Sequence, residues 1–273
     1  MQYIDKPSRH DMPNCQNDKL SFAIPLENVK AVLFDLFDTL VLIGDSHECS
    51  VKSLIKLHNS LSKNGFDCAF ADFESSYLKV VKQIEAETAT SLTEPHFKLY
   101  VSNTLSKLGY TVSPGDKAIG EGANDFCREF CRYVQADPQA ITVLQSVQAK
   151  YKTGLISNLT FSESAWDLLK INNLKNLFDF IIVCGDVNMR KPDPKIFKMA
   201  LDELGVSAYE AIFVGDTLET DIEGAINTGI IPIHINRRKN NYINSLTAEQ
   251  YLTINALEEL LPILNQIESL LYC

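Results

Sequence analysis

An apolar run that ends abruptly at a carboxylate limits the possible folds more than any other feature of the sequence. Val32, Leu33 and Phe34 are followed by Asp35, and Thr39 comes four residues later. This pattern is typical of a buried strand that opens onto a loop. Because open α/β sheets bind ligands at the carboxyl ends of their strands, Asp35 is expected to be a functional residue.

Beyond Ala140, short apolar runs alternate with segments of helical periodicity. Alternation of this kind predicts an α/β fold, in which helices cover both faces of a parallel sheet. The expected strands after the first one are 153–156, 180–183, 211–214, 231–234 and 251–254.

Between the first strand and Ala140 the apolar residues recur at spacings of three and four, and no buried strand is evident. That spacing predicts a bundle of about four helices. The expected helices are 46–63, 73–88, 97–108 and 123–135. Because the bundle follows the strand that ends at Asp35, we expect it to form a lid above that strand end.

Composition is typical of a globular protein, with 273 residues, 45% of them hydrophobic and 22% charged. The net charge of −10 opposes binding to nucleic acid or to an anionic membrane. One basic cluster, 237–239, is interpreted as a solvated loop. No apolar run approaches the roughly 18 residues of a membrane span. We therefore expect no nucleic-acid and no membrane partner.

Seven cysteines are scattered along the chain, with no CxxC pair and no zinc-like spacing of Cys and His. This distribution predicts reduced thiols and a cytoplasmic location. Cys127 and Cys131 are four residues apart on an expected helix, so they share a face, and packing explains the pair better than metal binding.

Three further motifs follow the first one in a fixed order. They are Leu155-Ile156-Ser157-Asn158, then Arg190-Lys191-Pro192-Asp193-Pro194, and then Val214-Gly215-Asp216-Thr217 with Asp221. Together with the motif at Asp35, they resemble the haloacid dehalogenase-like (HAD) hydrolase superfamily, subfamily I, with a helical type 1 cap. The resemblance covers nearly all of residues 29–264.

The resemblance implies a Rossmann-like core with an inserted helical-bundle cap domain. We place the core at residues 27–44 and 139–273 and the cap at 45–138. Residues 1–26 contain three prolines and show no periodicity, so they are interpreted as an irregular N-terminal extension.

The resemblance also implies roles for the motif residues. Asp35 is expected to be the nucleophile, and Ser157, Asn158 and Lys191 to bind the substrate, with Ser157 on the phosphoryl group and Lys191 neutralising charge. Asp221 is expected to bind metal-bound water or to orient Lys191. Taken alone, Ser157 is equally compatible with a helix N-cap, and Asp221 with an acid in the first turn of a helix. Thr39 is expected to hydrogen-bond within the loop of Asp35.

Asp216 follows a second expected strand beside the strand of Asp35. Two carboxylates at adjacent strand ends repel one another unless a cation lies between them. Mg²⁺ is a hard ion that takes one or two carboxylates together with phosphate and water. The resemblance implies a Mg²⁺ site formed by Asp35, the backbone carbonyl of Phe37 and Asp216.

The sequence departs from the superfamily at Phe37. Phosphatases of this superfamily usually carry a second Asp there, which protonates the leaving group. General acid–base help is worth roughly 10²–10⁴ in rate, so its absence weakens turnover without abolishing it. Asp38 is interpreted as structural, because a one-residue step in an extended loop points the side chain the other way.

The predicted function is a Mg²⁺-dependent phosphatase of a small phosphorylated metabolite, acting through an aspartyl-phosphate intermediate as a monomer or homodimer. Two alternatives remain. An aromatic residue at position 37 also fits a 2-haloacid dehalogenase, although Asp216 and the absence of Arg between Thr39 and Arg128 oppose this. A catalytically weak HAD-fold binding protein would explain the missing acid.

Overall fold

The computed structural model describes residues 28–237, 246–247 and 250–271. Its main sheet contains β1 (Ala31–Phe34), β4 (Lys152–Ser157), β5 (Phe180–Val183), β6 (Ala211–Gly215), β7 (Ile231–Ile235) and β8 (Leu252–Ile254). All neighbouring strands are parallel, in the spatial order β5-β4-β1-β6-β7-β8. The predicted parallel α/β sheet is therefore confirmed.

The predicted strands agree with the structure to within one residue at each end. The strand 180–183 is confirmed without change, 153–156 gains one residue at each end, and the other three gain or lose a single terminal residue. The agreement is close because central strands of a parallel sheet are buried on both faces and are therefore apolar throughout. Every residue of β1 is fully buried.

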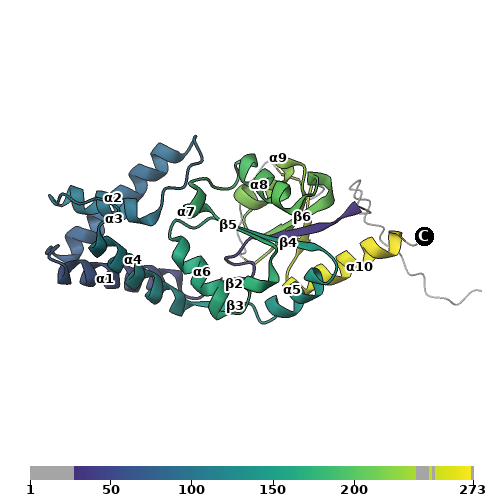
Figure 1. The fold of residues 1–273 in the computed structure, drawn as a ribbon, viewed down its shortest axis with the longest axis horizontal. Helices are drawn as coiled ribbons and strands as arrows, with labels where there is room; N and C mark the ends of the chain where they lie inside the picture. The colour runs from purple at the N-terminus through teal and green to yellow at the C-terminus, as the bar shows by residue number, and fades with distance from the viewer. Residues whose placement is uncertain (1–27, 238–245, 248–249, 272–273) are drawn as a thin grey trace, which may run out of the picture.

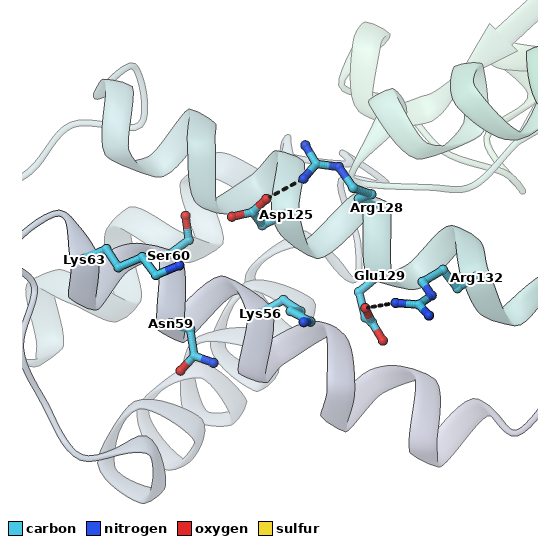
Figure 2. A pocket seen from close by; sticks show the side chains of 8 residues that line it. All are labelled: Lys56, Asn59, Ser60, Lys63, Asp125, Arg128, Glu129 and Arg132. Carbon is cyan, nitrogen blue, oxygen red and sulfur yellow. Dashed lines mark hydrogen bonds and ion pairs between the residues drawn. The ribbon is translucent and has the colours of Figure 1, made fainter.

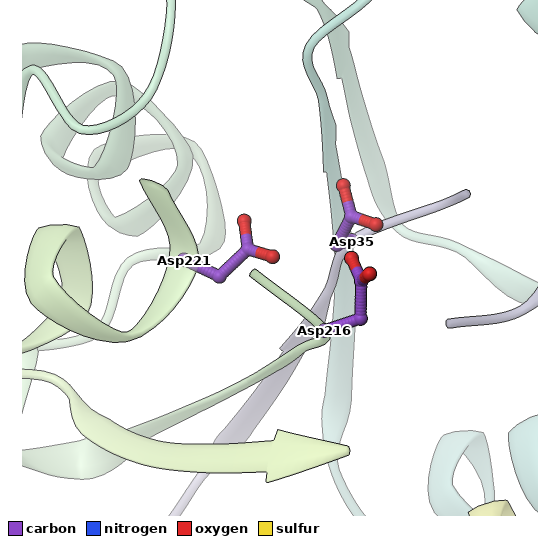
Figure 3. Close-up of side chains that lie close together, drawn as sticks. All are labelled: Asp35, Asp216 and Asp221. Atoms are coloured by element: carbon purple, nitrogen blue, oxygen red, sulfur yellow. The ribbon is translucent and has the colours of Figure 1, made fainter. Parts of the chain in front are cut away.

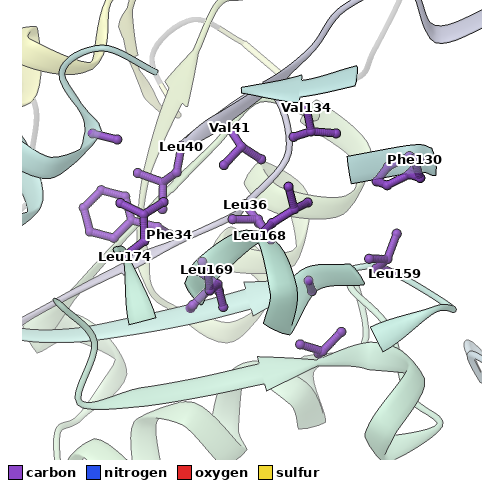
Figure 4. Close-up of a cluster of buried hydrophobic side chains, with 14 of the residues drawn as sticks. Phe34, Leu36, Leu40, Val41, Phe130, Val134, Leu159, Leu168, Leu169 and Leu174 are labelled. Atoms are coloured by element: carbon purple, nitrogen blue, oxygen red, sulfur yellow. The ribbon is translucent and has the colours of Figure 1, made fainter. Parts of the chain in front are cut away.

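Helices cover both faces of the sheet. They are α5 (Ala140–Gln148), α6 (Ser162–Ile171), α7 (Cys184–Val187), α8 (Pro194–Leu204), α9 (Glu223–Thr228) and α10 (Leu260–Leu271). Side chains of β1 alternate between two apolar clusters, as the period of a strand requires. Ala31 and Leu33 pack with α8 and α9, whereas Val32 and Phe34 belong to the larger cluster with α5, α6 and α10. Figure 4 shows how that larger cluster continues from Phe34 to Phe130.

Four helices form a separate bundle at one end of the molecule (Figure 1). They are α1 (Ser46–Lys63), α2 (Phe70–Thr88), α3 (Phe97–Lys107) and α4 (Lys117–Phe130). The bundle leaves and rejoins the sheet through an antiparallel pair of short strands, β2 (Val41–Ile43) and β3 (Val134–Ala136). An inserted helical cap on a parallel sheet is thus the observed architecture, and the first expected helix, 46–63, is confirmed without change.

The fourth expected helix, 123–135, is wrong at both ends. Helix α4 begins at Lys117, where the Asp116 side chain accepts a 2.8 Å hydrogen bond from the Ala118 amide. It ends at Phe130 and is followed by a 3-10 turn, Cys131–Tyr133, and by β3. Pairing of β3 with β2, which lies about ninety residues earlier, overrides the helical periodicity.

The basic cluster at 237–239 is not simply a solvated loop. The Arg237 guanidinium forms an ion pair with Asp137 and donates a 3.4 Å hydrogen bond to the Thr39 carbonyl. Its side chain is 18% exposed. The interpretation was therefore wrong for Arg237, which ties the segment after β7 to the segments after β1 and β3, while residues 238 and 239 lie outside the described part.

Three further expectations concern the N-terminal segment, the cysteines and membrane spans. The expected N-terminal extension, 1–26, lies outside the described residues. Five cysteines lie in the described part, and all five are free thiols, as expected. Among the described residues, no helix is long and apolar enough to cross a membrane.

Candidate active site

Three carboxylates meet at the carboxyl edge of the sheet (Figure 3). Asp35 follows β1, Asp216 follows β6, and Asp221 lies in a π-helical turn, Leu218–Ile222. Each offers an oxygen within 4.8 Å of the oxygens of the other two. The parallel strands β1 and β6 end together because Phe34 is paired with Val214. The turn that carries Asp221 is of the π-helical type, which is frequent at functional sites.

The ammonium of Lys191 is buried against two of these carboxylates. Its Nζ lies 2.7 Å from Asp35 Oδ1, 2.7 Å from Asp221 Oδ1 and 2.8 Å from the Ile156 carbonyl oxygen. The residue is 1% exposed. Burial lowers the pKa of Lys191, but the charges of Asp221 and Asp35 outweigh this effect and raise it, so the ammonium stays protonated. Two roles were expected for Asp221, and its direct contact with Lys191 supports the orientation of that lysine.

One ammonium does not neutralise three carboxylates. Burial, together with repulsion from Asp35 and Asp221, raises the pKa of Asp216 to about 7. Burial also raises the pKa of Asp35 to about 6, although the neighbouring Lys191 lowers it. A surplus of buried negative charge, formed by oxygen ligands, fits a hard divalent cation such as Mg²⁺.

The backbone around Asp221 is closely packed. Its Oδ2 accepts a 3.0 Å hydrogen bond from the Thr217 amide. A Cβ atom built on Gly215 would lie 2.5 Å from the side chain of Asp221. Gly215 is therefore required at the end of β6, because any side chain there would displace Asp221 from Lys191.

Ser157 ends β4, next to the strand of Asp35. Its Oγ is buried and has no hydrogen-bond partner among the described residues. The N-cap alternative is excluded, because α6 begins at Ser162 with Phe161 at the cap position. Buried hydroxyls are normally hydrogen-bonded, so Ser157 is suited to a group that the protein itself does not supply.

The hydrogen bonds of Asn158 and Thr39 are not those expected from the sequence. Both ends of the Asn158 amide hydrogen-bond to the main chain of Lys191, each at 3.0 Å. Its expected role in binding substrate stays a prediction. The expectation for Thr39 was wrong, because its Oγ1 is buried without a hydrogen-bond partner in the described part of the chain.

Phe37 joins the loop of Asp35 to the cap. Its ring lies edge-on to Phe130 of α4 with 5.8 Å between centroids, and Phe130 lies 4.9 Å from Phe161 in the same way. Asp38 has a φ of 53° and accepts a 3.4 Å hydrogen bond from the Ile43 amide. That contact supports the structural interpretation of Asp38.

A hollow of about 300 Å³ lies between α1 and α4, on helices of the cap (Figure 2). Its residues are Lys56, Asn59, Ser60, Lys63, Asp125, Arg128, Glu129 and Arg132. Arg128 pairs with Asp125 at 3.0 Å and Arg132 with Glu129 at 3.4 Å. Because its arginines are already paired and it includes none of the motif residues, this hollow is not the catalytic centre.

The order and geometry of these motifs agree with comparisons to known proteins. The family model described as haloacid dehalogenase-like hydrolase matches residues 65–235. The chain belongs to this family. It is therefore a HAD-like hydrolase, and the suspected superfamily assignment is confirmed.

Curated relatives of this HAD-like hydrolase include phosphatases. A glyceraldehyde 3-phosphate phosphatase of Methanopyrus kandleri is 26% identical over 218 residues, which is 77% of this chain and 85% of the relative. An N-acylneuraminate-9-phosphatase of Rattus norvegicus is 39% identical over 254 residues, 88% of this chain and 95% of the relative. A 2-haloacid dehalogenase structure from Pseudomonas syringae has a TM-score of 0.66 at 22% identity, covering 87% of this chain and 99% of that one. The last likeness concerns the fold alone.

Sequence reasoning did not predict two contacts beside Lys191. Cys184 hydrogen-bonds to Asn158 with 2.9 Å between Sγ and Oδ1. Arg190 pairs with Glu94 of the cap at 3.4 Å. No spacing in the sequence identifies either contact, because the partners lie 26 and 96 residues away.

Proposed function

We propose that this HAD-like hydrolase is a Mg²⁺-dependent phosphatase of a small phosphorylated metabolite. The observation that carries the proposal is the buried cluster of Asp35, Lys191, Asp216 and Asp221 at the sheet edge. The two curated relatives are both phosphatases of small phosphorylated compounds by name. The net charge of −10 favours a small-molecule substrate over nucleic acid or an anionic membrane.

In the proposed reaction, a carboxylate oxygen of Asp35 attacks phosphorus, and the leaving oxygen departs with the electron pair of the P–O bond. Water then hydrolyses the aspartyl phosphate to release inorganic phosphate and regenerate Asp35. Splitting one displacement into two is the usual benefit of a covalent nucleophile. Lys191 offsets the negative charge of Asp35 and of the phosphoryl group, and the buried Ser157 hydroxyl donates to a phosphoryl oxygen.

Asp35, Asp216 and the Phe37 carbonyl would hold Mg²⁺, which when bound supplies Lewis-acid stabilisation of the phosphoryl oxygens. Lys191 contacts both Asp35 and Asp221. Asn158 is a further candidate for substrate contact. We propose core boundaries of 27–44 and 139–273, a cap at 45–138, a cytoplasmic location, and a monomer or homodimer.

Phe37 offers no proton to the leaving group. We therefore propose that turnover is fastest for acyl and aryl phosphates. Their leaving groups are weak bases, which depart readily without a proton. The helical cap closes over the sheet edge and excludes bulk water. Phe37 and Phe130 form one of the contacts between loop and cap.

Hydrolysis of p-nitrophenyl phosphate and acetyl phosphate, with and without Mg²⁺, tests the proposal. We expect metal-dependent phosphate release that Asp35→Asn abolishes, because the amide is a poor nucleophile. Asp202→Asn on the exposed surface of α8 makes the same chemical change away from the site and should leave the rate unaltered.

The rival activities give different results in the same assay. Halide release from 2-chloropropionate without metal would assign the chain to the dehalogenases. Silence with every substrate, in a folded protein, would favour the catalytically weak binding protein. An Asp35→Asn variant with full phosphatase activity would exclude the aspartyl-phosphate intermediate.

A further inference from the structure

The side-chain amide of Asn158 hydrogen-bonds to both the backbone N–H and the backbone carbonyl of Lys191. Its Nδ2 donates to the Lys191 carbonyl and its Oδ1 accepts from the Lys191 amide, each at 3.0 Å. The same Oδ1 accepts a hydrogen bond from the thiol of Cys184, with 2.9 Å between Sγ and Oδ1. Asn158 directly follows β4 and Cys184 directly follows β5, so two neighbouring parallel strands bring both side chains to Lys191.

The segment that carries Lys191 has no regular structure of its own to hold it. It lies between α7 and α8, and the next residue, Pro192, has no amide hydrogen. The lysine side chain is long and flexible, yet its Nζ lies 2.7 Å from both Asp35 and Asp221. Placing the ammonium this closely requires a fixed main chain, which the Asn158 amide supplies.

The thiol of Cys184 hydrogen-bonds to the oxygen of that amide. An Asn side chain can be turned over, but only one orientation places its oxygen opposite the Lys191 amide hydrogen. Burial raises the pKa of Cys184 to about 12, so the thiol keeps its proton at neutral pH and acts as a donor. A donor at this place favours the orientation in which Oδ1 faces both Cys184 and the Lys191 amide.

The segment after β4 and the segment after β5 pack closely against one another. The Gly185 amide donates to the Leu159 carbonyl at 3.0 Å. A Cβ atom on Gly185 would lie 2.7 Å from the Thr160 carbonyl oxygen and 2.8 Å from that of Leu159. Absence of a side chain at Gly185 therefore lets the turn after β5 approach the loop after β4 and brings Cys184 against Asn158.

We propose that Cys184 and Asn158 are positioning residues for the reaction, which set the Lys191 ammonium against Asp35 by orienting the main chain of Lys191. The inference rests on the proposed function in so far as Lys191 neutralises charge at Asp35. In this role the thiol acts through Asn158, and Asn158 acts through Lys191. Neither residue exchanges a proton or forms a bond with the substrate in this role.

Kinetics of Cys184 variants, with p-nitrophenyl phosphate and Mg²⁺, test the first step. Cys184→Ala should lower kcat about 10-fold with little change in KM, because a misplacement of about 1 Å at a catalytic group costs up to about 10²-fold. Cys184→Ser keeps a donor and should restore most of kcat. Cys127→Ala removes a buried thiol from α4 and should leave kcat unchanged. Equal kcat values for Cys184→Ala, Cys184→Ser and Cys127→Ala would overturn the proposal.

A double-mutant cycle tests the second step. Asn158→Ala should lower kcat strongly in the wild-type background but cause no further loss in Lys191→Ala, because residues that act through one another are not additive. Additive losses would show that Asn158 acts independently of Lys191.

A cycle without substrate separates this inference from the proposed function. Urea unfolding of wild type, Cys184→Ala, Asn158→Ala and the double variant should show non-additive losses of stability. If the wild type releases no phosphate, the proposed function fails while this cycle still decides whether Cys184 orients Asn158. Additive losses in this cycle would refute the orientation even in an active phosphatase.

Discussion

Phe37 is the residue at which the sequence departs from the motif expected of a phosphatase in this superfamily. Phe37→Asp should raise kcat for alkyl phosphates about 10-fold or more, because general acid help is worth roughly 10²–10⁴ and the new carboxylate is imperfectly placed. The gain should be smaller for p-nitrophenyl phosphate, whose leaving group needs no proton. Rates with both substrates at saturating Mg²⁺ measure this.

Loss of the aromatic ring is itself a change that needs a control. Phe37 packs edge-on against Phe130, and any small residue removes that contact. Phe37→Asn has the size of the Asp variant without its acid. Equal rates for the Asn and Asp variants would mean that the ring, and not proton transfer, determines the effect.

At the scale of elements, the loop between α2 and α3 docks onto the segment before Lys191. The Arg190 amide donates to the Leu92 carbonyl at 3.0 Å, and its guanidinium lies 3.4 Å from Glu94 Oε2 and from the Thr88 carbonyl oxygen. Glu94 and Arg190 are mostly buried, with side chains 10% and 25% exposed. These contacts join the cap to the main chain beside Lys191.

Glu94→Gln keeps the shape of the side chain but removes its charge. We expect the Arg190 amide to exchange its hydrogen about 2- to 5-fold faster, the change produced by losing an ion pair worth roughly 0.5–1 kcal/mol. Hydrogen exchange followed by mass spectrometry measures this. Glu87→Gln, on the exposed face of α2, should have no effect. Equal exchange in both variants would contradict a docking role.

Helices and strands that depend on their own sequence were easier to predict than those that depend on pairing with a distant segment. Helix α1 is set by its own apolar spacing and by Asp45, whose side chain caps the Glu48 amide at 2.9 Å. Strands β2 and β3 have three residues each and exist only because they pair with one another across the cap insertion. No periodicity can reveal a strand of that length.

At the scale of the whole molecule, stability should depend on pH through the carboxylate cluster. The pKa of Asp216 is raised from 3.8 to about 7, so the metal-free folded state binds more protons than the unfolded state between these values. The free energy of unfolding therefore falls as pH rises through this window. In EDTA, the Tm of Asp216→Asn relative to wild type should rise from pH 5 to pH 8. Each kcal/mol of difference in unfolding free energy corresponds to about 2–4 °C in Tm.

Magnesium should reverse this dependence. A cation that binds only the folded state at 100 times its Kd adds about 2.7 kcal/mol, which corresponds to a rise in Tm of roughly 5–10 °C. The rise should be larger at pH 8 than at pH 6, because protons compete for Asp35 and Asp216, and it should be lost in Asp216→Asn. Equal shifts in wild type and variant would show that Mg²⁺ binds elsewhere.

Sequence patterns alone predict the parallel sheet and the placement of Asp35, Ser157 and Asp216 at adjacent strand ends. They do so because burial on both faces demands apolar strands, and parallel strands end at one edge. The contacts of Lys191 with Asp35 and Asp221, and those of Asn158 with Lys191 and Cys184, are seen only in the folded structure. These contacts join residues 26 to 156 positions apart, and their directions depend on rotamers and packing that no local pattern encodes.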